Sequence, residues 1–288
     1  MIKYINYNYI DLPRLTIWVA KELIDSIVNG LTSIRTTFDL GMSSEKAIIE
    51  DDCVIIREHY RTCIDELNLI EEDKVYEITD YGLRAILISD GGVYKLKPVS
   101  KDTAPTLEIN GIHMHRIVGI TPWMDSYLKV HVAKVRRGHY VLDTCMGLGY
   151  TAIHSILKGA YVLTIEIDPN VIEITRHNPW SRRLEDQRIR IIHGDIIKVV
   201  DELGDHAFHR IIHDPPRFTP RTGDLYSLEL YKEFYRVLKP NGILFHYTGE
   251  PGRHGGPRIV KGIGERLRRA GFIVKYNRRV QGYIAKKF

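Results

Sequence analysis

The sequence predicts an α/β protein built around a parallel β-sheet that is covered by helices. From Thr121 onward, short apolar runs typical of buried strands alternate regularly with stretches of helical periodicity. These runs are almost continuously apolar, which is typical of parallel strands buried on both faces. Glycines and acidic residues stand directly after several of the runs, and in such sheets ligands bind beyond the carboxyl ends of the strands.

The expected elements of this part follow one another in strict order. Thr121 and Pro122 form a favourable helix start, because threonine caps a helix well and proline fits its first position. That helix is expected over 121–135. Strands are expected at 139–143, 161–167, 189–194, 208–214 and 242–248, helices at 149–159, 169–177, 195–203, 225–239 and 257–271, and a closing antiparallel pair at 272–277 and 282–288.

Residues 1–110 are expected to form a smaller α+β module with a role in substrate binding. A helix is predicted over 12–30, where Gly30 provides a stop signal. Strands are predicted at 74–80, 85–89 and 93–98, and Asp90-Gly91-Gly92 between the last two is a strong hairpin signal. The turn-rich segment 97–111 is expected to be a linker. We therefore divide the chain into residues 1–110 and 111–288.

Composition indicates an ordinary globular protein in the cytoplasm. The chain has 288 residues, 44% hydrophobic and 27% charged. No apolar run approaches the roughly 18 residues of a membrane span, and the N-terminal residues lack the pattern of a signal peptide. Three cysteines without CxxC spacing make a disulfide framework unexpected. Scarce glutamine beside abundant Ile, Arg, Lys and Glu favours a thermophilic source.

The net charge of +5 is distributed unevenly along the chain. Residues 251–288 contain 11 Lys and Arg against one acid, a net charge of +10. Residues 1–110 contain 12 basic and 19 acidic residues, a net charge of −7. Such asymmetry is typical of proteins that face a polyanion at one end, so the basic C-terminal segment predicts RNA as a partner. A solvated basic surface is the alternative.

The stretch YVLDTCMGLGYTAI, residues 140–153, predicts a nucleotide-type site. An apolar strand ends at Asp143, two glycines follow at Gly147 and Gly149, and a helix begins. The glycines fit G-x-G-x-x-A, so a dinucleotide is the first alternative. A pyrophosphate, however, prefers helix amides without a neighbouring carboxylate. Asp143 therefore favours a cationic ligand such as S-adenosylmethionine, which carries a sulfonium and an amino group.

Three further strand ends agree with this interpretation. Glu166 ends the second strand, where an acid can accept both ribose hydroxyls. Asp195 and Ile196 follow the third strand, where they would contact and cover the adenine; Asp195 as a plain helix cap is the alternative. Asp214 follows the fourth strand, in the sequence His-Asp-Pro-Pro.

With these motifs, residues from about 120 to 288 resemble the class I S-adenosylmethionine-dependent methyltransferases. DTCMGLG resembles their first motif, IEID the second, GDI the third and DPPRF the fourth. More narrowly, the chain resembles an archaeal group of predicted methyltransferases sometimes labelled spermidine-synthase-like. The resemblance implies a Rossmann-like, seven-stranded methyltransferase sheet and S-adenosyl-L-methionine as cofactor. The implied cofactor-binding residues are Asp143, Gly147, Gly149, Glu166, Asp195 and Ile196.

Asp-Pro-Pro-aromatic loops occur in methyltransferases that act on amide-like or exocyclic nitrogens. The lone pair of such a nitrogen is delocalised, so two acceptors, the Asp side chain and the first Pro carbonyl, would orient it toward the methyl group. The prolines hold the loop rigid. The implied catalytic residues are Asp214, Pro215, Pro216 and Phe218.

The loop departs from that pattern, because Arg217 stands in the aromatic position and Phe218 comes one residue later. We expect Arg217 to bind substrate phosphate or cover a base, together with substrate contacts from Tyr247 and Trp123. Methylation at cytosine C5 needs a cysteine nucleophile, but Cys145 lies in the cofactor loop, which disfavours that reaction. His113 and His115 share a strand face without a third ligand, so we expect no metal.

The sequence therefore favours a methyltransferase acting on a nucleobase nitrogen in RNA, either tRNA or rRNA. An aminopropyltransferase is the first alternative, although the loop Thr144-Cys145-Met146 lacks the acid that such enzymes favour. Methylation of a protein or of a small amine is the second alternative. A non-catalytic RNA-binding factor is the third, but retention of Asp143, Glu166 and Asp195 argues against it.

Overall fold

The computed structural model describes residues 2–249 and 256–288, which divide into two compact units. The C-terminal unit comprises residues 2–7, Met124–Pro169 and the described part of 183–288, and the N-terminal unit comprises Asn8–Trp123 and Asn170–Arg182. We treat each unit by itself.

The division lies after Trp123 and not between residues 110 and 111 as predicted from the sequence. The expected linker 97–111 contains strand β11 (Thr106–Ile109), which pairs with β10 (Val93–Lys97) and with β12 (Ile112–His113). The turn residues that suggested a linker therefore only connect strands of one small sheet, and its last strand carries the unit past residue 110.

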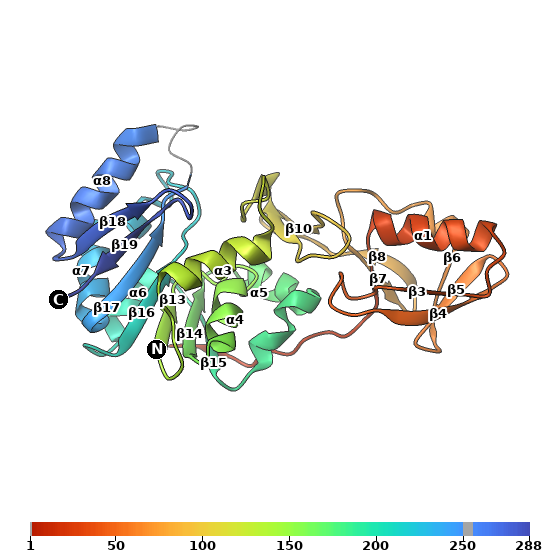
Figure 1. The fold of residues 1–288 in the computed structure, drawn as a ribbon, viewed down its shortest axis with the longest axis horizontal. Coiled ribbons are helices and arrows are strands. Elements are labelled where there is room, and N and C mark those ends of the chain that lie inside the picture. Colours follow the sequence, from red (N-terminus) through yellow and green to blue (C-terminus); the bar gives the residue numbers. More distant parts are fainter. Residues whose placement is uncertain (1, 250–255) are drawn as a thin grey trace. The chain divides into compact units, whose positions relative to one another are not determined.

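The C-terminal unit contains an eight-stranded mixed sheet of order β1-β15-β14-β13-β16-β17-β19-β18 (Figure 1). The predicted α/β fold is confirmed, with the seven expected strands all present. An eighth strand, β1, comes from the N-terminus and pairs antiparallel with β15. The bounds are β1 Tyr4–Ile5, β13 Tyr140–Asp143, β14 Tyr161–Glu166, β15 Ile189–His193, β16 Phe208–His213, β17 Leu238–Tyr247, β18 Ile273–Asn277 and β19 Gly282–Lys286.

Helices pack against this sheet because each presents one apolar stripe. Helix α4 packs on β13 and β14, α7 on β17, and α8 on β18 and α7. Leu230 and Phe234 of α7 share a core with Ile263 and Leu267 of α8. The bounds are α3 Pro122–Val132, α4 Tyr150–Leu157, α6 Ile196–Val199, α7 Leu228–Val237 and α8 Gly256–Arg269, with 3₁₀ turns η2 Val200–Glu202 and η3 Gly223–Tyr226. Helix α5 Pro169–Arg176 and most of the 3₁₀ turn η1 Pro179–Glu185 belong to the N-terminal unit.

The parallel register brings the ends of the strands to one edge. Asp143 lies opposite Thr164 of β14 and Ile212 of β16, and Glu166 lies opposite His193 of β15. Because parallel strands carry their carboxyl ends on the same side, the residues that follow β13, β14, β15, β16 and β17 face a common space. This edge is where the candidate site lies.

The N-terminal unit contains three small antiparallel sheets, of orders β12-β11-β10-β9, β2-β7-β8 and β3-β4-β5-β6. The predicted helix is present as α1, and the predicted hairpin joins β9 to β10. Strands β3 to β6 were not predicted. The remaining bounds are α1 Ile17–Val28, α2 Ile64–Leu67, β2 Arg14–Leu15, β3 Ser33–Thr36, β4 Glu45–Glu50, β5 Cys53–Ile56, β6 Tyr60–Cys63, β7 Tyr76–Thr79, β8 Gly82–Ala85 and β9 Leu87–Ser89.

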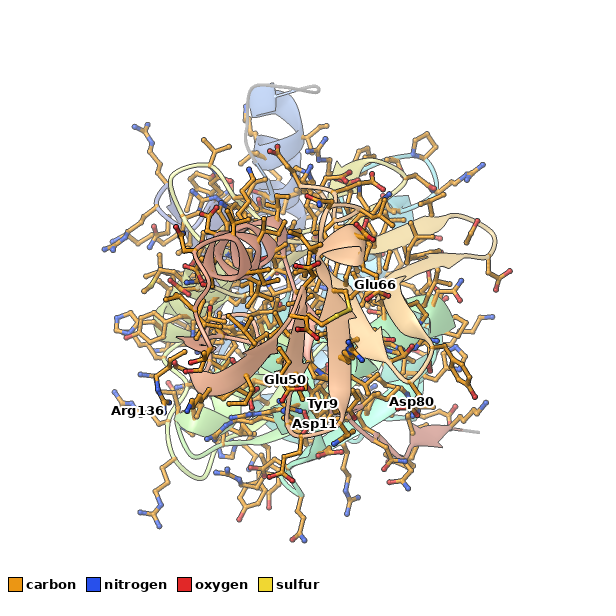
Figure 2. All side chains as sticks on the ribbon, turned by 90° about the vertical axis from the view of Figure 1, so that its right-hand side faces the viewer. Tyr9, Asp11, Glu50, Glu66, Asp80 and Arg136 are labelled. Carbon is orange, nitrogen blue, oxygen red and sulfur yellow. A yellow bond between two sulfur atoms is a disulfide. The ribbon has the colours of Figure 1, made fainter. Side chains whose placement is uncertain are left out.

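One disulfide corrects the expectation from the cysteine spacing. Cys53 and Cys63 lie directly opposite each other on β5 and β6 and are bonded through their sulfurs. The spacing of ten residues does not reveal this disulfide by itself, because the pairing depends on the register of the hairpin. Glu66, labelled in Figure 2, accepts a hydrogen bond from the Cys63 backbone N–H at 3.2 Å and so caps α2.

Among the helices that the structure describes, none combines the length and the apolar character needed to cross a bilayer.

The N-terminal unit encloses a charged cluster around Arg14. The guanidinium is fully buried and donates hydrogen bonds to the backbone oxygens of Ile10, Leu12 and His177 at 2.5–2.7 Å. Its charge lies 3.5 Å from the Glu77 carboxylate, which is 1% exposed. Burial alone would raise the pKa of Glu77, but the hydrogen bond from His177 and the nearby Arg14 charge lower it to about 2.

This cluster predicts acid sensitivity of the N-terminal unit. The folded pKa of Glu77 lies below the ordinary value of 4.5, so its contribution of about 3 kcal/mol is complete above pH 4.5 and is lost as the pH falls toward 2. The three tryptophans, Trp18, Trp123 and Trp180, all lie in this unit, so denaturant unfolding followed by tryptophan fluorescence reports on it.

We expect the variant E77Q to be less stable at pH 7 and to lose most of the pH dependence between pH 4.5 and 2. The matched control E50Q changes an exposed carboxylate on β4 (Figure 2) and should leave the profile as it is in the parent protein. Equal slopes for the parent and E77Q would contradict the assignment.

Candidate functional site

The candidate site lies at the carboxyl edge of the eight-stranded sheet and begins with the loop after β13. Gly147 and Gly149 have positive φ angles of 52° and 76°, which L-amino acids with side chains rarely adopt. The Gly149 N–H donates to the Met146 carbonyl at 2.8 Å, so the loop closes as a tight turn onto α4. The sequence pattern of strand, carboxylate, glycines and helix thus folds as expected.

Asp143 is fully buried and holds the site together. Its two carboxylate oxygens accept hydrogen bonds from the hydroxyls of Thr151 at 2.9 Å and Thr164 at 2.7 Å. Burial raises its pKa to about 7, against the opposing effect of these hydroxyls. Asp143 therefore ties β13 to β14 and to α4, and its direct contact with a cofactor stays a prediction.

Glu166 faces the glycine loop from the end of β14. Its Oε2 accepts from the Gly147 N–H at 3.0 Å and its Oε1 accepts from the Asp168 N–H at 3.1 Å. Burial raises its pKa to about 7, while these two backbone N–H groups favour the ionised form. Two backbone groups thus fix the carboxylate in one orientation, while its side chain stays partly exposed.

The glycine loop leaves space for a ligand beside the Glu166 carboxylate. A Cβ added at Gly147 would meet no atom within 4 Å, so the backbone there borders open space. At Gly149 the same atom would come within 2.6 Å of Leu184, so this glycine is needed for packing. Gly147 is therefore the glycine that leaves room for a ligand, and Glu166 beside it has the acceptor oxygens that ribose hydroxyls require.

Asp195 follows β15 as the cap of α6. Its Oδ1 accepts a hydrogen bond from the Ile197 N–H at 2.9 Å, so the alternative role weighed from the sequence is the one observed. Ile196 is 3% exposed and belongs to the hydrophobic core. The adenine contacts predicted for these two residues remain predictions, and the visible role of each is structural.

Asp214 follows β16 and is held by a buried lysine that the sequence analysis did not single out. Lys129 of α3 is 1% exposed, and its Nζ lies 2.6 Å from Asp214 Oδ2 and 2.8 Å from Asp125 Oδ2. The same ammonium lies 4.3 Å from the centre of the Tyr247 ring. Asp125 is fully buried and Asp214 is 18% exposed, so Asp214 is the member of this group that reaches the open edge.

The charges of this group stabilise one another. Burial alone would lower the pKa of Lys129, but the Asp214 and Asp125 carboxylates raise it above its ordinary value. Burial raises the pKa of Asp214, and the Lys129 charge opposes that rise. The lysine is therefore charged at neutral pH, and it favours an ionised Asp214.

Two buried, neutral histidines stand near the ends of β16 and β17, and one of them, His213, directly precedes Asp214. His213 Nε2 donates to the Leu225 carbonyl at 2.8 Å, which leaves Nδ1 to accept from the Thr144 hydroxyl at 2.7 Å. His246 Nδ1 donates to the Tyr247 carbonyl at 2.7 Å, and Nε2 accepts from the Tyr231 hydroxyl at 2.6 Å. Burial lowers the pKa of His213 to about 4, so it stays neutral above that pH.

The Pro-Pro segment is fixed by Tyr226, whose hydroxyl donates to the Pro216 carbonyl at 2.7 Å. Pro215 is buried, while Arg217 and Phe218 are exposed. The Phe218 ring packs edge-on against Tyr226 with centroids 5.3 Å apart. Phe218 and Arg217 thus lie next to Asp214 in the chain on an open surface, where a flat substrate can reach them.

Tyr247 lies at the end of β17 with its ring over Lys129, and its substrate contact stays a prediction. Trp123 belongs to the N-terminal unit, where its ring packs against Trp180 with centroids 4.9 Å apart. Trp123 therefore lies outside the unit that contains the candidate site, and its substrate contact stays a prediction. Cys145 is a free thiol in the glycine loop, and burial raises its pKa well above the ordinary value, which makes it a poor nucleophile.

The basic C-terminal segment contributes fewer available charges than the sequence count of +10. Lys287 is buried and donates to the carbonyls of Tyr235 and Leu238, and Arg266 donates to the Tyr226 carbonyl. The side chains of Arg253 and Arg258 lie outside the described residues. The exposed cations are Lys261, Arg268, Arg269, Lys275, Arg278 and Arg279.

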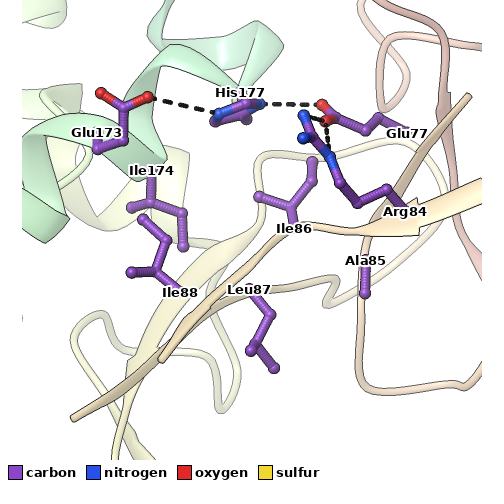
Figure 3. A pocket seen from close by; sticks show the side chains of 9 residues that line it. All are labelled: Glu77, Arg84, Ala85, Ile86, Leu87, Ile88, Glu173, Ile174 and His177. Atoms are coloured by element: carbon purple, nitrogen blue, oxygen red, sulfur yellow. Dashed lines mark hydrogen bonds and ion pairs between the residues drawn. The ribbon is translucent and has the colours of Figure 1, made fainter. Parts of the chain in front are cut away.

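A separate cavity of ≈ 170 Å³ lies in the N-terminal unit, between α5 and strands β7 to β9 (Figure 3). His177 lies between two carboxylates, with Nδ1 3.0 Å from Glu77 and Nε2 3.8 Å from Glu173, and Arg84 pairs with Glu77. The ionisable groups that line the cavity are paired with one another through hydrogen bonds or ion-pair contacts, and its remaining walls are aliphatic. It therefore belongs to the structural cluster around Glu77.

Metal-ligating groups do not gather in the described part of the chain: no cluster of three His, Cys, Asp or Glu there has the arrangement of a metal site. His113 pairs with Glu108 at 2.9 Å and His115 with the Thr106 hydroxyl at 3.1 Å, so both have structural partners.

Comparison with known proteins places the chain in a family. The uncharacterized protein MJ1233 of Methanocaldococcus jannaschii is 42% identical over 285 residues, which cover 96% of each chain. The chain belongs to the MJ1233 family. The putative ribosomal RNA large subunit methyltransferase MJ1649 of the same organism is 26% identical over 93 residues, 32% of this chain and 24% of that protein.

The model of the spermine/spermidine synthase domain matches residues 138–277 of this MJ1233-family chain. A spermidine synthase in complex with the transition state analogue AdoDATO superposes with a TM-score of 0.56 and 21% identity over 70% of this chain and 74% of that one. The spermidine synthase from Thermotoga maritima gives the same TM-score at 20% identity, over 70% and 73% of the two chains. At these identities the superpositions show a shared α/β fold and do not identify the reaction.

Sequence reasoning missed three residues that position the site's charges. Lys129 follows Asp125 by four residues on α3, a spacing that usually marks a surface ion pair. Thr151 and Thr164 fall inside an apolar helix and strand, where hydroxyls carry no distinct signal. Burial gives Lys129, Thr151 and Thr164 their roles, and burial depends on the assembled sheet.

Different roles for the two glycines are testable. G149A should lower the free energy of unfolding of the C-terminal unit by more than about 2 kcal/mol, because alanine at positive φ costs about 1–2 kcal/mol and its Cβ collides with Leu184. G147A should lower the free energy of unfolding only by the about 1–2 kcal/mol that alanine at positive φ costs. It should also weaken cofactor binding. Denaturant unfolding followed by far-UV circular dichroism measures the stabilities.

The double variant G149A/L184A provides the control. Truncating Leu184 removes the collision, so the double variant should be more stable than the sum of the two single changes predicts. Additive effects would show that Gly149 is needed for its φ angle alone.

Proposed function

We propose that this protein is an S-adenosylmethionine-dependent methyltransferase that methylates a nucleobase nitrogen in RNA. The observation that carries the proposal is the Asp214-Pro215-Pro216 loop, held rigid next to the glycine loop and Glu166 at one sheet edge. The rigid loop offers two acceptors, Asp214 Oδ1 and the Pro215 carbonyl, to the two hydrogens of an exocyclic amine. The partial match to a putative ribosomal RNA methyltransferase supports the same substrate class.

The residues of this chain would act mainly by positioning. When bound, S-adenosylmethionine would supply an electrophilic methyl group on a sulfonium. Asp214 and Pro215 would orient the lone pair of the acceptor nitrogen toward that carbon. As the acceptor nitrogen bonds to the methyl carbon, sulfur would keep the electron pair of the broken carbon–sulfur bond. The nitrogen then loses one proton to Asp214 or to water.

Aminopropyl transfer to a polyamine is the second candidate, favoured by the match to the spermine/spermidine synthase domain. In this reaction a cationic acceptor has to be held by several carboxylates while one amine is deprotonated. Here the carboxylate at the open edge, Asp214, is already paired with Lys129. We therefore place this candidate second. The proposal includes a cytoplasmic location and RNA as a partner. Methylation of a protein or of a small amine, and a non-catalytic role in RNA binding, are its further alternatives.

Labelled donors separate the two reactions. We expect the purified protein to transfer the methyl group of S-adenosylmethionine to RNA from cells that lack the gene, where the target site is unmodified. D214N should lower kcat at least 100-fold, because the amide cannot accept the proton or stabilise the developing charge. P216A should keep measurable activity as the milder loop change. Transfer of an aminopropyl group from decarboxylated donor to putrescine, with RNA unlabelled, would contradict the proposal.

The exposed cations of the C-terminal segment are expected to contact RNA phosphates. Neutralising Lys275 and Arg278 together should reduce the slope of log K against log salt by about 1.4, since each single-strand phosphate contact contributes about 0.7. The matched double change of Lys21 and Lys46, exposed in the N-terminal unit, should leave the slope as it is. Filter binding of single-stranded RNA over a range of salt concentrations measures both slopes.

A further inference from the structure

Lys129 is the feature of the site that the proposed chemistry leaves unexplained. Burying an ammonium between two carboxylates is unfavourable unless the geometry is good, and apolar side chains of similar size often stabilise a fold equally well. Methyl transfer to an oriented nitrogen does not by itself require a cation at this place. The presence of a fully enclosed lysine directly behind Asp214 therefore calls for a functional reason.

The contacts of the ammonium show that it does not bind substrate. Its Nζ lies 2.8 Å from Asp125, 2.6 Å from Asp214 and 4.3 Å from the centre of the Tyr247 ring. These contacts occupy the ammonium on three sides, and its side chain is 1% exposed. Asp125 holds it from within the same helix, one turn away. Lys129 thus acts on Asp214 and not on a ligand.

We propose that Lys129 is a positioning and specificity-determining residue that holds Asp214 through Oδ2, favours its ionised form, keeps Oδ1 toward the acceptor, and favours a neutral acceptor nitrogen. This inference rests on the proposed function and names the acceptor class. A nucleobase amine is such an acceptor, whereas a polyamine nitrogen would have to share Asp214 with the Lys129 ammonium.

The electrostatic argument follows from the charges at the open edge. Lys129 lies between Asp125 and Asp214, so the three groups together carry a formal net charge of −1. A polyamine nitrogen that reaches Oδ1 would share Asp214 with an ammonium 2.6 Å from the other carboxylate oxygen, and the two cations would repel each other. A neutral amine meets a fixed, ionised acceptor and needs no counter-charge. The other titratable groups that face this pair are Asp125 of α3, Asp143 and Cys145 after β13, Tyr226 of η3 and Tyr247 of β17.

The first test measures the ionisation of Asp214 directly and does not depend on activity. Carbon-13 NMR of labelled aspartate carboxyls, with the Asp214 signal assigned by its loss in D214N, follows the titration between pH 4 and 9. We expect K129Q, which keeps a hydrogen-bond donor and removes the charge, to raise the midpoint by more than one pH unit. K129R should stay close to the parent protein. An unchanged midpoint in K129Q would overturn the inference.

Two controls keep the result interpretable. K158M removes another lysine of the C-terminal unit that lies over a tyrosine ring, that of Tyr127, and should leave the Asp214 midpoint unchanged. If circular dichroism shows K129Q to be unfolded, D125N/K129Q removes the uncompensated buried carboxylate and provides the same comparison.

The second test measures acceptor choice. At pH 7, K129Q should lower kcat for RNA about 100-fold with KM changed less than threefold, and the loss should shrink as the pH rises. In the same variant, spermidine should bind at least tenfold more tightly than to the parent protein. A K129Q pH profile parallel to that of the parent would indicate a structural lysine only.

The two tests separate the inference from the proposed function. If the parent protein labels no RNA while the Asp214 midpoint shifts in K129Q, the proposed function fails and the role of Lys129 in ionising Asp214 stands. If RNA is labelled and neither the midpoint nor spermidine binding changes, the function stands and the inference fails.

Discussion

The constraint on which this structure depends is the concentration of acidic side chains at one edge of a parallel sheet. Strands β13, β14 and β16 each end in or are followed directly by a carboxylate, and the register places these ends side by side. In a partly desolvated place, like charges raise one another's pKa and oppose folding. Each carboxylate therefore needs hydrogen-bond donors or a cation beside it. The other residues of the site provide these donors and this cation.

The groups that stabilise the three carboxylates differ in kind, and this difference indicates the role of each carboxylate. Asp143 has two hydroxyl donors and no exposure, so it organises the sheet. Glu166 has two backbone donors and remains partly exposed, so it is oriented toward the glycine loop. Asp214 has a full positive charge behind it and stays partly exposed, which suits a carboxylate that must remain ionised while it meets a substrate. Fold comparisons alone would not separate these three residues.

The family relationship does not identify the reaction of this protein. The charged groups of the site provide an argument for one class of acceptor. The MJ1233 relative is uncharacterized, and the structural relatives include spermidine synthases that share the fold. A shared α/β sheet supports many transfer reactions, because the chemistry depends on what stands at the strand ends. In this chain the lysine behind Asp214 weighs against a polycationic acceptor. The proposal of RNA methylation rests on the Asp214-Pro215-Pro216 loop, and the charge of Lys129 is a second argument for a neutral acceptor.

The sequence by itself determined the α/β class, the succession of strands and helices along the chain and the positions of the acidic strand ends, because apolar periodicity and glycine placement are local signals. It also placed the closing antiparallel pair correctly. Only the tertiary structure decided which of those residues are enclosed. Lys129, Thr151 and Thr164 have the same local pattern as ordinary surface or core residues, and the cross-strand bond of Cys53 depends on a hairpin register. Burial and pairing across strands arise from contacts between distant segments, which a linear pattern does not contain.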